Sequence, residues 1–178
     1  MQKDVLTFWF EELKPSEWFE VSEPLDQLIT DRFSSLLNKA KKGELSDWRE
    51  TAHGRLAEIL ILDQFSRNIY RGRPEAFTQD ALALVLSQET IRAGADKALS
   101  AIEKSFLYMP YMHSESVLIH EEAMILFDQP GLESNHDFER RHKAIIDRFG
   151  RYPHRNAIVG RQSTAEEVEF LKEPGSSF

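Results

Sequence analysis

Apolar residues recur in this chain at the three-to-four-residue spacing of a helix, and this spacing restricts the fold more than any other feature. Ile29, Phe33, Leu37 and Ala40 lie on one face of a predicted helix, and the lysines and glycine at 41–43 are a typical helix end. Alternating β-branched segments bounded by turn pairs, the pattern of strands, are missing from the sequence. The sequence therefore predicts an all-α fold.

Further helices are expected along most of the chain, because the same spacing recurs between turn residues. Thr78 and Ser134 are candidate N-caps, Pro110 is a candidate helix end, and Gly150 follows the last periodic residue of its segment. A capping box at 163–166 precedes a short C-terminal helix. The other expected ranges are 5–13, 47–70, 78–92, about 99–109, about 114–127 and 134–149. We expect an array of about seven to nine antiparallel helices, and a single domain over residues 1–178 because no linker or repeat divides the chain.

The composition excludes several classes of function. The 178 residues include no cysteine, so disulfides, thiolate metal sites and cysteine nucleophiles are ruled out. A formal net charge of −8 disfavours binding to nucleic acid. Apolar runs are far shorter than the roughly 20 residues that cross a membrane, and the N-terminal residues lack the pattern of a signal peptide. We expect a cytoplasmic protein with no membrane segment.

Cofactors and metals are not expected either. The sequence has no glycine-rich dinucleotide or phosphate loop, no nucleophile elbow and no calcium-binding loop. His113 and His120, if both lie on one helix, are separated by about 10.5 Å along its axis, which is too far to share a metal ion. The sequence therefore predicts no cofactor and no metal site.

Ionisable side chains are expected on the apolar faces of three helices. Asp63 and Arg67 fall on the side of their helix that faces the core. His113 and His120 fall among apolar residues, and so does His142 on a later helix. One interpretation is structural: a partly buried ion pair, and core histidines with satisfied hydrogen bonds. The alternative is a functional site, because convergent ionisable groups in an apolar interior are typical of binding and catalytic pockets.

Arginine is concentrated in two segments, one around the turn at 71–74 and one around position 154. Guanidinium groups bind carboxylates and phosphates through paired hydrogen bonds, so these segments are candidates for an anion-binding cup. The alternative is two solvated turns that neutralise acidic neighbours. Asn156 is a candidate cap of a following helix whose amides would add to the site. The candidate ligand-binding residues are Arg67, Arg71, Arg148, Arg151, His154, Arg155 and Arg161.

The same segments resemble an uncharacterised bacterial family, catalogued as domain of unknown function 924. The resemblance rests on FWF at 8–10, LDQFSRNIYRG at 62–72, YMPYMHSE at 108–115, RFGRYPHRN at 148–156, GRQST at 160–164 and SSF at 176–178. It extends over essentially the whole chain and implies a helical array similar to tetratricopeptide-repeat proteins. It implies no activity, because such a fold serves many functions.

Three functions stay open after these observations. The first is a binding module that holds a small anionic ligand, or an acidic peptide end, on the arginines. The second is a cofactor-free hydrolase or lyase for an anionic substrate, with His113 or His142 as general base, oriented by Asp63 or Glu115. The third is a structural or interaction protein with no small-molecule site. The sequence narrowly favours the binding module and does not decide whether the protein is an enzyme.

Overall fold

The computed structural model describes residues 1–177, and Phe178, the last residue of the SSF motif, lies outside the described part. Residues 1–177 form helices and connecting turns and contain no strand, so the predicted all-α class is confirmed. None of the helices in this part of the chain has the length and apolar character needed to cross a membrane. The α-helices are α1 (Gln2–Thr7), α2 (Glu23–Lys41), α3 (Ala52–Leu60), α4 (Ser66–Ile69), α5 (Asp80–Arg92), α6 (Ala101–Met112), α7 (Val117–Phe127), α8 (Glu133–Phe149) and α9 (Ala165–Phe170).

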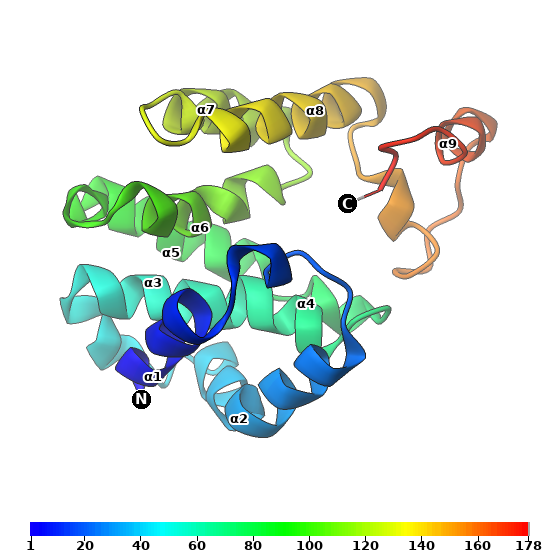
Figure 1. Ribbon diagram of the computed structural model, residues 1–178. Helices are drawn as coiled ribbons and strands as arrows, with labels where there is room; N and C mark the ends of the chain where they lie inside the picture. Colours follow the sequence, from blue (N-terminus) through cyan, green and yellow to red (C-terminus); the bar gives the residue numbers. More distant parts are fainter. Residues whose placement is uncertain (178) are drawn as a thin grey trace.

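Helices that follow one another in the chain pack together in layers (Figure 1). In the view of Figure 1, α7 and α8 form the uppermost layer, α5 and α6 lie below them, α3 and α4 come next, and α1 and α2 lie lowest. The C-terminal segment leaves α8 and runs down one side before it reaches α9. This course brings residues 155–161 back to the end of α6, where a pocket lies.

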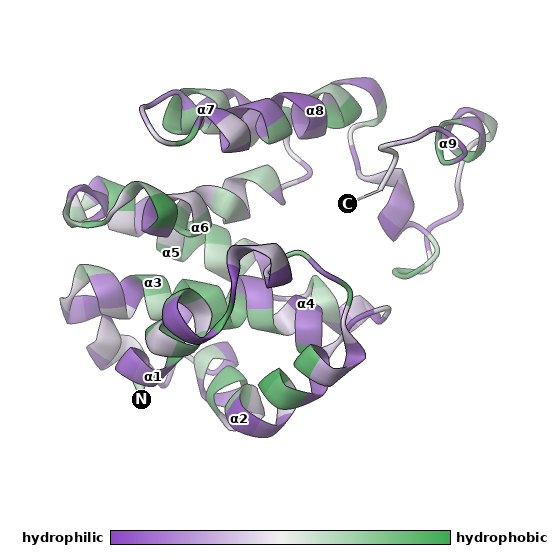
Figure 2. Cartoon of the chain, in the orientation of Figure 1, coloured by the Kyte–Doolittle hydropathy of each residue, from purple (hydrophilic) through white to green (hydrophobic). Residues whose placement is uncertain are grey.

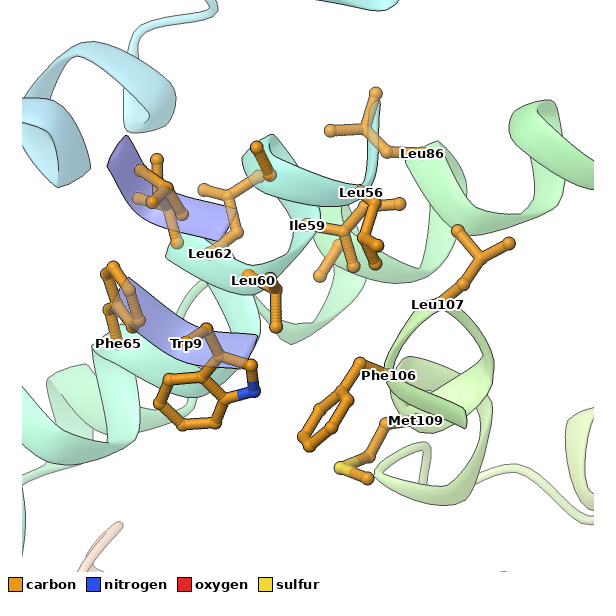
Figure 3. Packing of buried hydrophobic residues seen from close by; sticks show 14 of the residues in the cluster. Trp9, Leu56, Ile59, Leu60, Leu62, Phe65, Leu86, Phe106, Leu107 and Met109 are labelled. Carbon is orange, nitrogen blue, oxygen red and sulfur yellow. The ribbon is translucent and has the colours of Figure 1, made fainter. Parts of the chain in front are cut away.

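One large cluster of buried apolar side chains fills the space between these layers. Phe65 packs against Phe33 and Trp9, with ring centroids 4.8 and 5.6 Å apart, and Trp9 meets Phe106 edge-on. Figure 3 shows the rings of Trp9, Phe65 and Phe106 near the aliphatic side chains of Leu56, Ile59, Leu60 and Leu62. In Figure 2, hydrophobic and hydrophilic residues alternate along α2 and α8, as expected for amphipathic helices. Each buried aromatic or aliphatic side chain stabilises the fold by roughly 1.5–3 kcal/mol.

The single helix expected over residues 47–70 is wrong in its start and in its regularity. Residues Ser46–Glu50 form a 3-10 turn, and α3 begins only after Thr51, whose hydroxyl accepts a hydrogen bond from the amide of Gly54 at 3.0 Å. This is an N-cap, and it fixes where the helix begins. Residues Ile61–Phe65 then form a π-helical turn between α3 and α4. Turns of this kind are frequent at functional sites, and this one contains Asp63.

Pro110 does not end its helix, contrary to the prediction. α6 continues through Pro110 to Met112, and His113 is its C-cap residue. A proline removes one amide donor from a helix, but every residue from 105 to 112 is buried, and their packing outweighs that loss. His113 and His120 consequently lie on different elements, since His120 belongs to α7.

α5 and α8 lack the side-chain caps that the sequence suggested. Thr78 lies before α5 and donates its hydroxyl hydrogen to the carbonyl of Glu75 at 3.0 Å. Ser134 lies inside α8, which begins one residue earlier. Gly150 does end α8, and its φ of 68° is a left-handed conformation that glycine adopts without strain. The termini of these helices are therefore set by packing and turns rather than by capping hydroxyls.

The C-terminal capping box lies one residue later than expected. Thr164 accepts a hydrogen bond from the amide of Glu167, and the Glu167 carboxylate accepts one from the amide of Thr164. Asn156 caps no helix, because residues 156–160 form turns. Its side-chain amide donates instead to Ser163 and Glu167. Asn156 thus ties the turn to α9.

Candidate functional site

A pocket of about 340 Å³ lies between α5, the end of α6 and the C-terminal segment. Its volume is at the lower end of the range of small-molecule sites. Apolar residues line one part of it, namely Phe77, Ala81, Leu84, Pro110 and Val159. The other lining residues are polar or charged: Thr78, Asp80, His113, Ser114, Glu115, Arg155 and Arg161.

Asp63 and His113 form a hydrogen-bonded pair next to this pocket. Oδ1 of Asp63 lies 2.7 Å from Nδ1 of His113, and Oδ2 of Asp63 accepts a hydrogen bond from Gln64 at 2.6 Å. Asp63 is buried in the π turn, whereas the His113 side chain lines the pocket and is 13% exposed. Because Nδ1 faces a carboxylate, it carries the proton of the neutral imidazole. Nε2, for which residues 1–177 supply no hydrogen-bond partner, then holds the lone pair.

Burial and charge together set the protonation of this pair. Burial opposes ionisation of Asp63, but the charges of His113 and Arg67 and the hydrogen bonds from His113 and Gln64 outweigh it and hold the carboxyl pKa well below its usual range. Burial, followed by the positive charge of Arg67, lowers the pKa of His113, and Asp63 offsets only part of that effect. At neutral pH the pair is therefore an aspartate beside a neutral imidazole. This is the state that a general base requires.

Two arginines bracket Asp80, the first residue of α5. Arg67 donates to both Asp80 oxygens at 2.9 and 3.0 Å, and Arg155 donates to one of them at 3.2 Å. Arg67 also lies 3.1 Å from Asp63, so the predicted ion pair between these two residues is present. The guanidinium of Arg155 lies 4.6 Å from the ring centroid of Phe77. These contacts join α4, α5 and the C-terminal segment beside the pocket.

Glu115 and Arg161 form a further ion pair in the pocket wall. Arg161 donates to the two Glu115 oxygens at 2.6 and 2.8 Å, and the amide of Tyr152 donates to Glu115 at 2.8 Å. Partial burial raises the pKa of Glu115, but these hydrogen bonds outweigh it and lower the pKa below its usual range. Within residues 1–177 no three histidine or acidic side chains are grouped to hold a metal ion.

The end of α6 is held by side chains from elsewhere in the fold. The last carbonyl groups of a helix have no partner inside it, and here the carbonyls of the last residue of α6 and of the two residues after it accept hydrogen bonds from side chains outside α6. The donor and acceptor pairs are Tyr152 to Met112 (2.5 Å), Arg155 to His113 (3.0 Å) and His120 to Ser114 (2.8 Å). The turn that carries His113 is thus fixed by three separate contacts.

His120 is itself paired with a residue that the sequence analysis did not identify. Nδ1 of His120 lies 2.6 Å from Glu139 of α8, and both side chains are fully buried. Burial raises the pKa of Glu139 above its usual range. The one sequence signal for Glu139 is its position three residues before His142, on the same face of α8. Asp80 was also missed, because nothing in its local sequence distinguishes it from an ordinary first-turn carboxylate.

The other two candidate histidines, His142 and His154, do not line the pocket. His142 donates from Nδ1 to the carbonyl of Phe138 at 2.8 Å, within α8. Both rings pack near Tyr152, with centroids 5.9 and 5.7 Å from it. Burial lowers the pKa of His142 to about 3 and that of His154 to about 4, so both are neutral at pH 7. They belong to the packing behind the pocket.

Three of the seven candidate ligand-binding residues lie at ion pairs away from the pocket. Arg71 pairs with Asp26 of α2, while Arg148 and Arg151 pair with the α9 residues Glu166 and Glu167 at 2.9 and 2.7 Å. Among the arginines, the structure brings Arg67, Arg155 and Arg161 to the pocket region. Of the four proposed catalytic residues, it brings together Asp63, His113 and Glu115.

These features define an all-helical protein with a small pocket beside a histidine–carboxylate pair. The chain belongs to the family described as "Bacterial protein of unknown function (DUF924)", whose model matches residues 5–175. The chain is also similar to a solved structure described as "Structure of Protein of Unknown Function ATU0120 from Agrobacterium tumefaciens". That structure is 36% identical, with 97% of each chain covered and a TM-score of 0.92. Comparison with curated proteins finds no match. The family predicted from the sequence motifs is thereby confirmed.

Proposed function

We propose that the protein is an enzyme that acts on a small molecule in the pocket, with His113 as general base. The observation that carries the proposal is the 2.7 Å contact between Asp63 and His113, on a histidine that lines a pocket. A buried carboxylate that holds the Nδ1 proton fixes the orientation of the ring and leaves Nε2 as the proton acceptor. Asp63 does not line the pocket, so its role is to position His113.

The reaction supported best is a cofactor-free hydrolysis or elimination. A neutral imidazole at pH 7 can take a proton from a water molecule or from a substrate carbon. Arg155 and Arg161 lie in the same wall, and their N–H groups are suited to stabilise negative charge that develops on a substrate oxygen. General base catalysis by one positioned side chain typically contributes about 10²–10⁴-fold to a rate.

The test measures turnover of a panel of chromogenic substrates: carboxylic esters, amides, phosphate esters and β-elimination substrates. The proteins compared are wild type, His113→Gln and His53→Gln. His53 is 54% exposed on the surface, so its variant is a matched control for the loss of a histidine. We expect at least one class to be turned over by wild type and His53→Gln, and at least about 100-fold more slowly by folded His113→Gln. The enzyme proposal fails if no class shows turnover that depends on His113.

A binding module without turnover is a second candidate, because Arg155 and Arg161 lie in the pocket wall. The expected likeness to tetratricopeptide-repeat arrays suggests the same role, by analogy of fold alone. In this case a small carboxylate or a short acidic peptide at 100 times its dissociation constant stabilises the fold by about 2.7 kcal/mol. The rise in melting temperature would be the same in wild type and His113→Gln. If the protein turns over no substrate and no ligand raises its melting temperature, a structural or interaction role would be favoured.

A further inference from the structure

We propose that the substrate is an uncharged ester of a small carboxylic acid, and not a phosphate or another multiply charged anion. The inference rests on the proposed role of His113 and adds the chemical class of its substrate. It differs from the anionic ligand expected from the arginine-rich sequence. Three properties of the pocket support it: charges that cancel, free hydrogen-bond donors on Arg155, and the apolar part of the wall.

The charges around the pocket cancel. Two carboxylates and two guanidinium groups line it, a further carboxylate and guanidinium group lie just behind the wall, and the imidazole of His113 is neutral at pH 7. A doubly charged phosphate would meet no surplus of positive charge here, and the net charge of −8 on the whole chain repels it further. The carboxylates are Asp63, Asp80 and Glu115, and the cations are Arg67, Arg155 and Arg161.

The second property is that hydrogen-bond donors of Arg155 are free. Both oxygens of Asp80 and of Glu115 already accept hydrogen bonds from arginines. Arg155 donates one hydrogen bond from each terminal nitrogen, to Asp80 and to the carbonyl of His113, so one hydrogen remains on each. Its Nε is buried and has no partner, so it adds to the positive charge of the wall without facing a ligand. A carbonyl oxygen, which accepts hydrogen bonds without carrying a full charge, complements this surface.

The apolar part of the wall suits the carbon chain of an ester. Phe77, Leu84, Pro110 and Val159 line it. At about 30 Å³ for each water-sized group, a pocket of about 340 Å³ encloses roughly eleven non-hydrogen atoms, which accommodates the acyl part of an ester but not a bulky leaving group as well. The volume therefore favours a short acyl chain.

The reaction that follows is a hydrolysis with water as the nucleophile. The water oxygen attacks the carbonyl carbon while Nε2 of His113 takes one water proton, and the charge that develops on the carbonyl oxygen is stabilised by N–H groups of Arg155. The bond between the carbonyl carbon and the alkoxy oxygen then breaks, and His113 returns the proton to the leaving oxygen. One ester and one water molecule give one carboxylic acid and one alcohol.

The first experiment compares three substrates that share one leaving group: 4-nitrophenyl acetate, 4-nitrophenyl butyrate and 4-nitrophenyl phosphate. We expect wild type and His53→Gln to hydrolyse both carboxylic esters, and His113→Gln to be at least about 100-fold slower in kcat/KM. We expect no turnover of the phosphate. Turnover of the phosphate that depends on His113 would overturn the substrate class and leave the proposed function intact. Carboxylic esters that are hydrolysed no faster by wild type than by His113→Gln would also overturn it.

The second experiment changes the charge balance by one unit. Glu115→Gln removes a negative charge from the pocket wall, and Asp80→Asn makes the same change from α5 if the first variant does not fold. We expect the preference for the singly charged 4-nitrophenyl hemisuccinate over the butyrate to rise about tenfold relative to wild type. Glu166→Gln is the matched control, because that carboxylate is 62% exposed and lies outside the pocket. The same preference in all these proteins would show that charge balance does not select the substrate.

Discussion

The hydroxyl of Tyr152 donates a hydrogen bond to the carbonyl oxygen of Met112 at 2.5 Å, across 40 positions of the chain. Tyr152 is fully buried, and its hydroxyl also lies 3.2 Å from Nε2 of His120. Its backbone amide donates to Glu115. One residue of the C-terminal segment therefore contacts both sides of the turn that carries His113. Substitution of Tyr152 should affect the pocket indirectly, through this turn.

Tyr152→Phe should destabilise the fold by about 1–3 kcal/mol, because it leaves the Met112 carbonyl buried without this donor. Urea unfolding of wild type and variant measures the difference. Tyr70→Phe is the matched control, since the Tyr70 hydroxyl interacts with Lys41 in a partly exposed position, and it should change stability by less than about 1 kcal/mol. Equal losses of stability in the two variants would show that the hydrogen bond to Met112 contributes no more to the free energy of unfolding than the contact of Tyr70 does.

Asp63→Asn should lower the pKa of His113 still further. Asp63 is the residue whose charge and hydrogen bond favour the protonated imidazole, while burial and Arg67 disfavour it and stay in place in the variant. NMR titration of the His113 ring measures the shift. Activity that depends on His113 should fall at least about tenfold, because the ring loses its fixed tautomer. An unchanged titration curve would mean that the two side chains do not pair in solution.

Arg151→Ala should destabilise the fold by about 1–3 kcal/mol at neutral pH, because it leaves the buried carboxylate of Glu167 without its two hydrogen bonds from a guanidinium group. Arg148→Ala, whose partner Glu166 is exposed, should cost less than about 1 kcal/mol. The hydrogen bonds from Arg151 lower the pKa of Glu167 to about 2 from an ordinary 4.5. Because the pKa of Glu167 is lower in the folded state than in the unfolded state, its ionised carboxylate stabilises the fold above pH 4.5. This stabilisation is lost as the pH falls toward 2. The difference in the free energy of unfolding between wild type and Arg151→Ala should shrink over that pH window. A difference that stays constant would contradict the role given to the Arg151–Glu167 pair.

His142 should make the protein sensitive to acid. Its pKa is lowered by burial from 6.5 to about 3, so between these values the unfolded chain binds a proton that the folded chain does not. Stability should therefore fall as the pH falls through this window, by about 1.4 kcal/mol per pH unit for one proton. His142→Asn keeps an N–H donor for the Phe138 carbonyl and removes the proton. Urea unfolding at pH 4.5–6.5 should show a weaker dependence of stability on pH in this variant than in wild type or His53→Gln. Parallel pH profiles would exclude His142 as the source of the acid sensitivity.

The periodicity of apolar residues was sufficient to predict the helices, because burial of one face is what most helices in such a chain require. It was not sufficient to predict their irregularities. The segment that contains Asp63 is apolar on nearly all sides, so its pattern does not show that an extra residue is inserted at the π turn. Pro110 was expected to end α6 because a proline loses a hydrogen bond, but the local sequence does not show how much packing surrounds it.

The site was predicted in part for a similar reason. Asp63 and His113 were recognised as inward-facing, and their contact follows from the packing of α6 against α3 and the π turn. The arginines were expected to gather because they are close in sequence. Their partners are carboxylates from distant elements, such as Asp26 for Arg71 and Glu167 for Arg151, and these decide where each arginine lies. Local sequence carries no information about such partners.

The distribution of the pocket residues along the chain has a consequence for biosynthesis. Asp63 and His113 are made early enough to pair once α6 has formed, but Arg155 and Arg161 leave the ribosome only after α8. During synthesis, His113 is therefore present before the two arginines that contact its turn and neutralise the carboxylates of the pocket. A translation product that stops before position 150 would retain most of the large apolar core and lack a finished pocket.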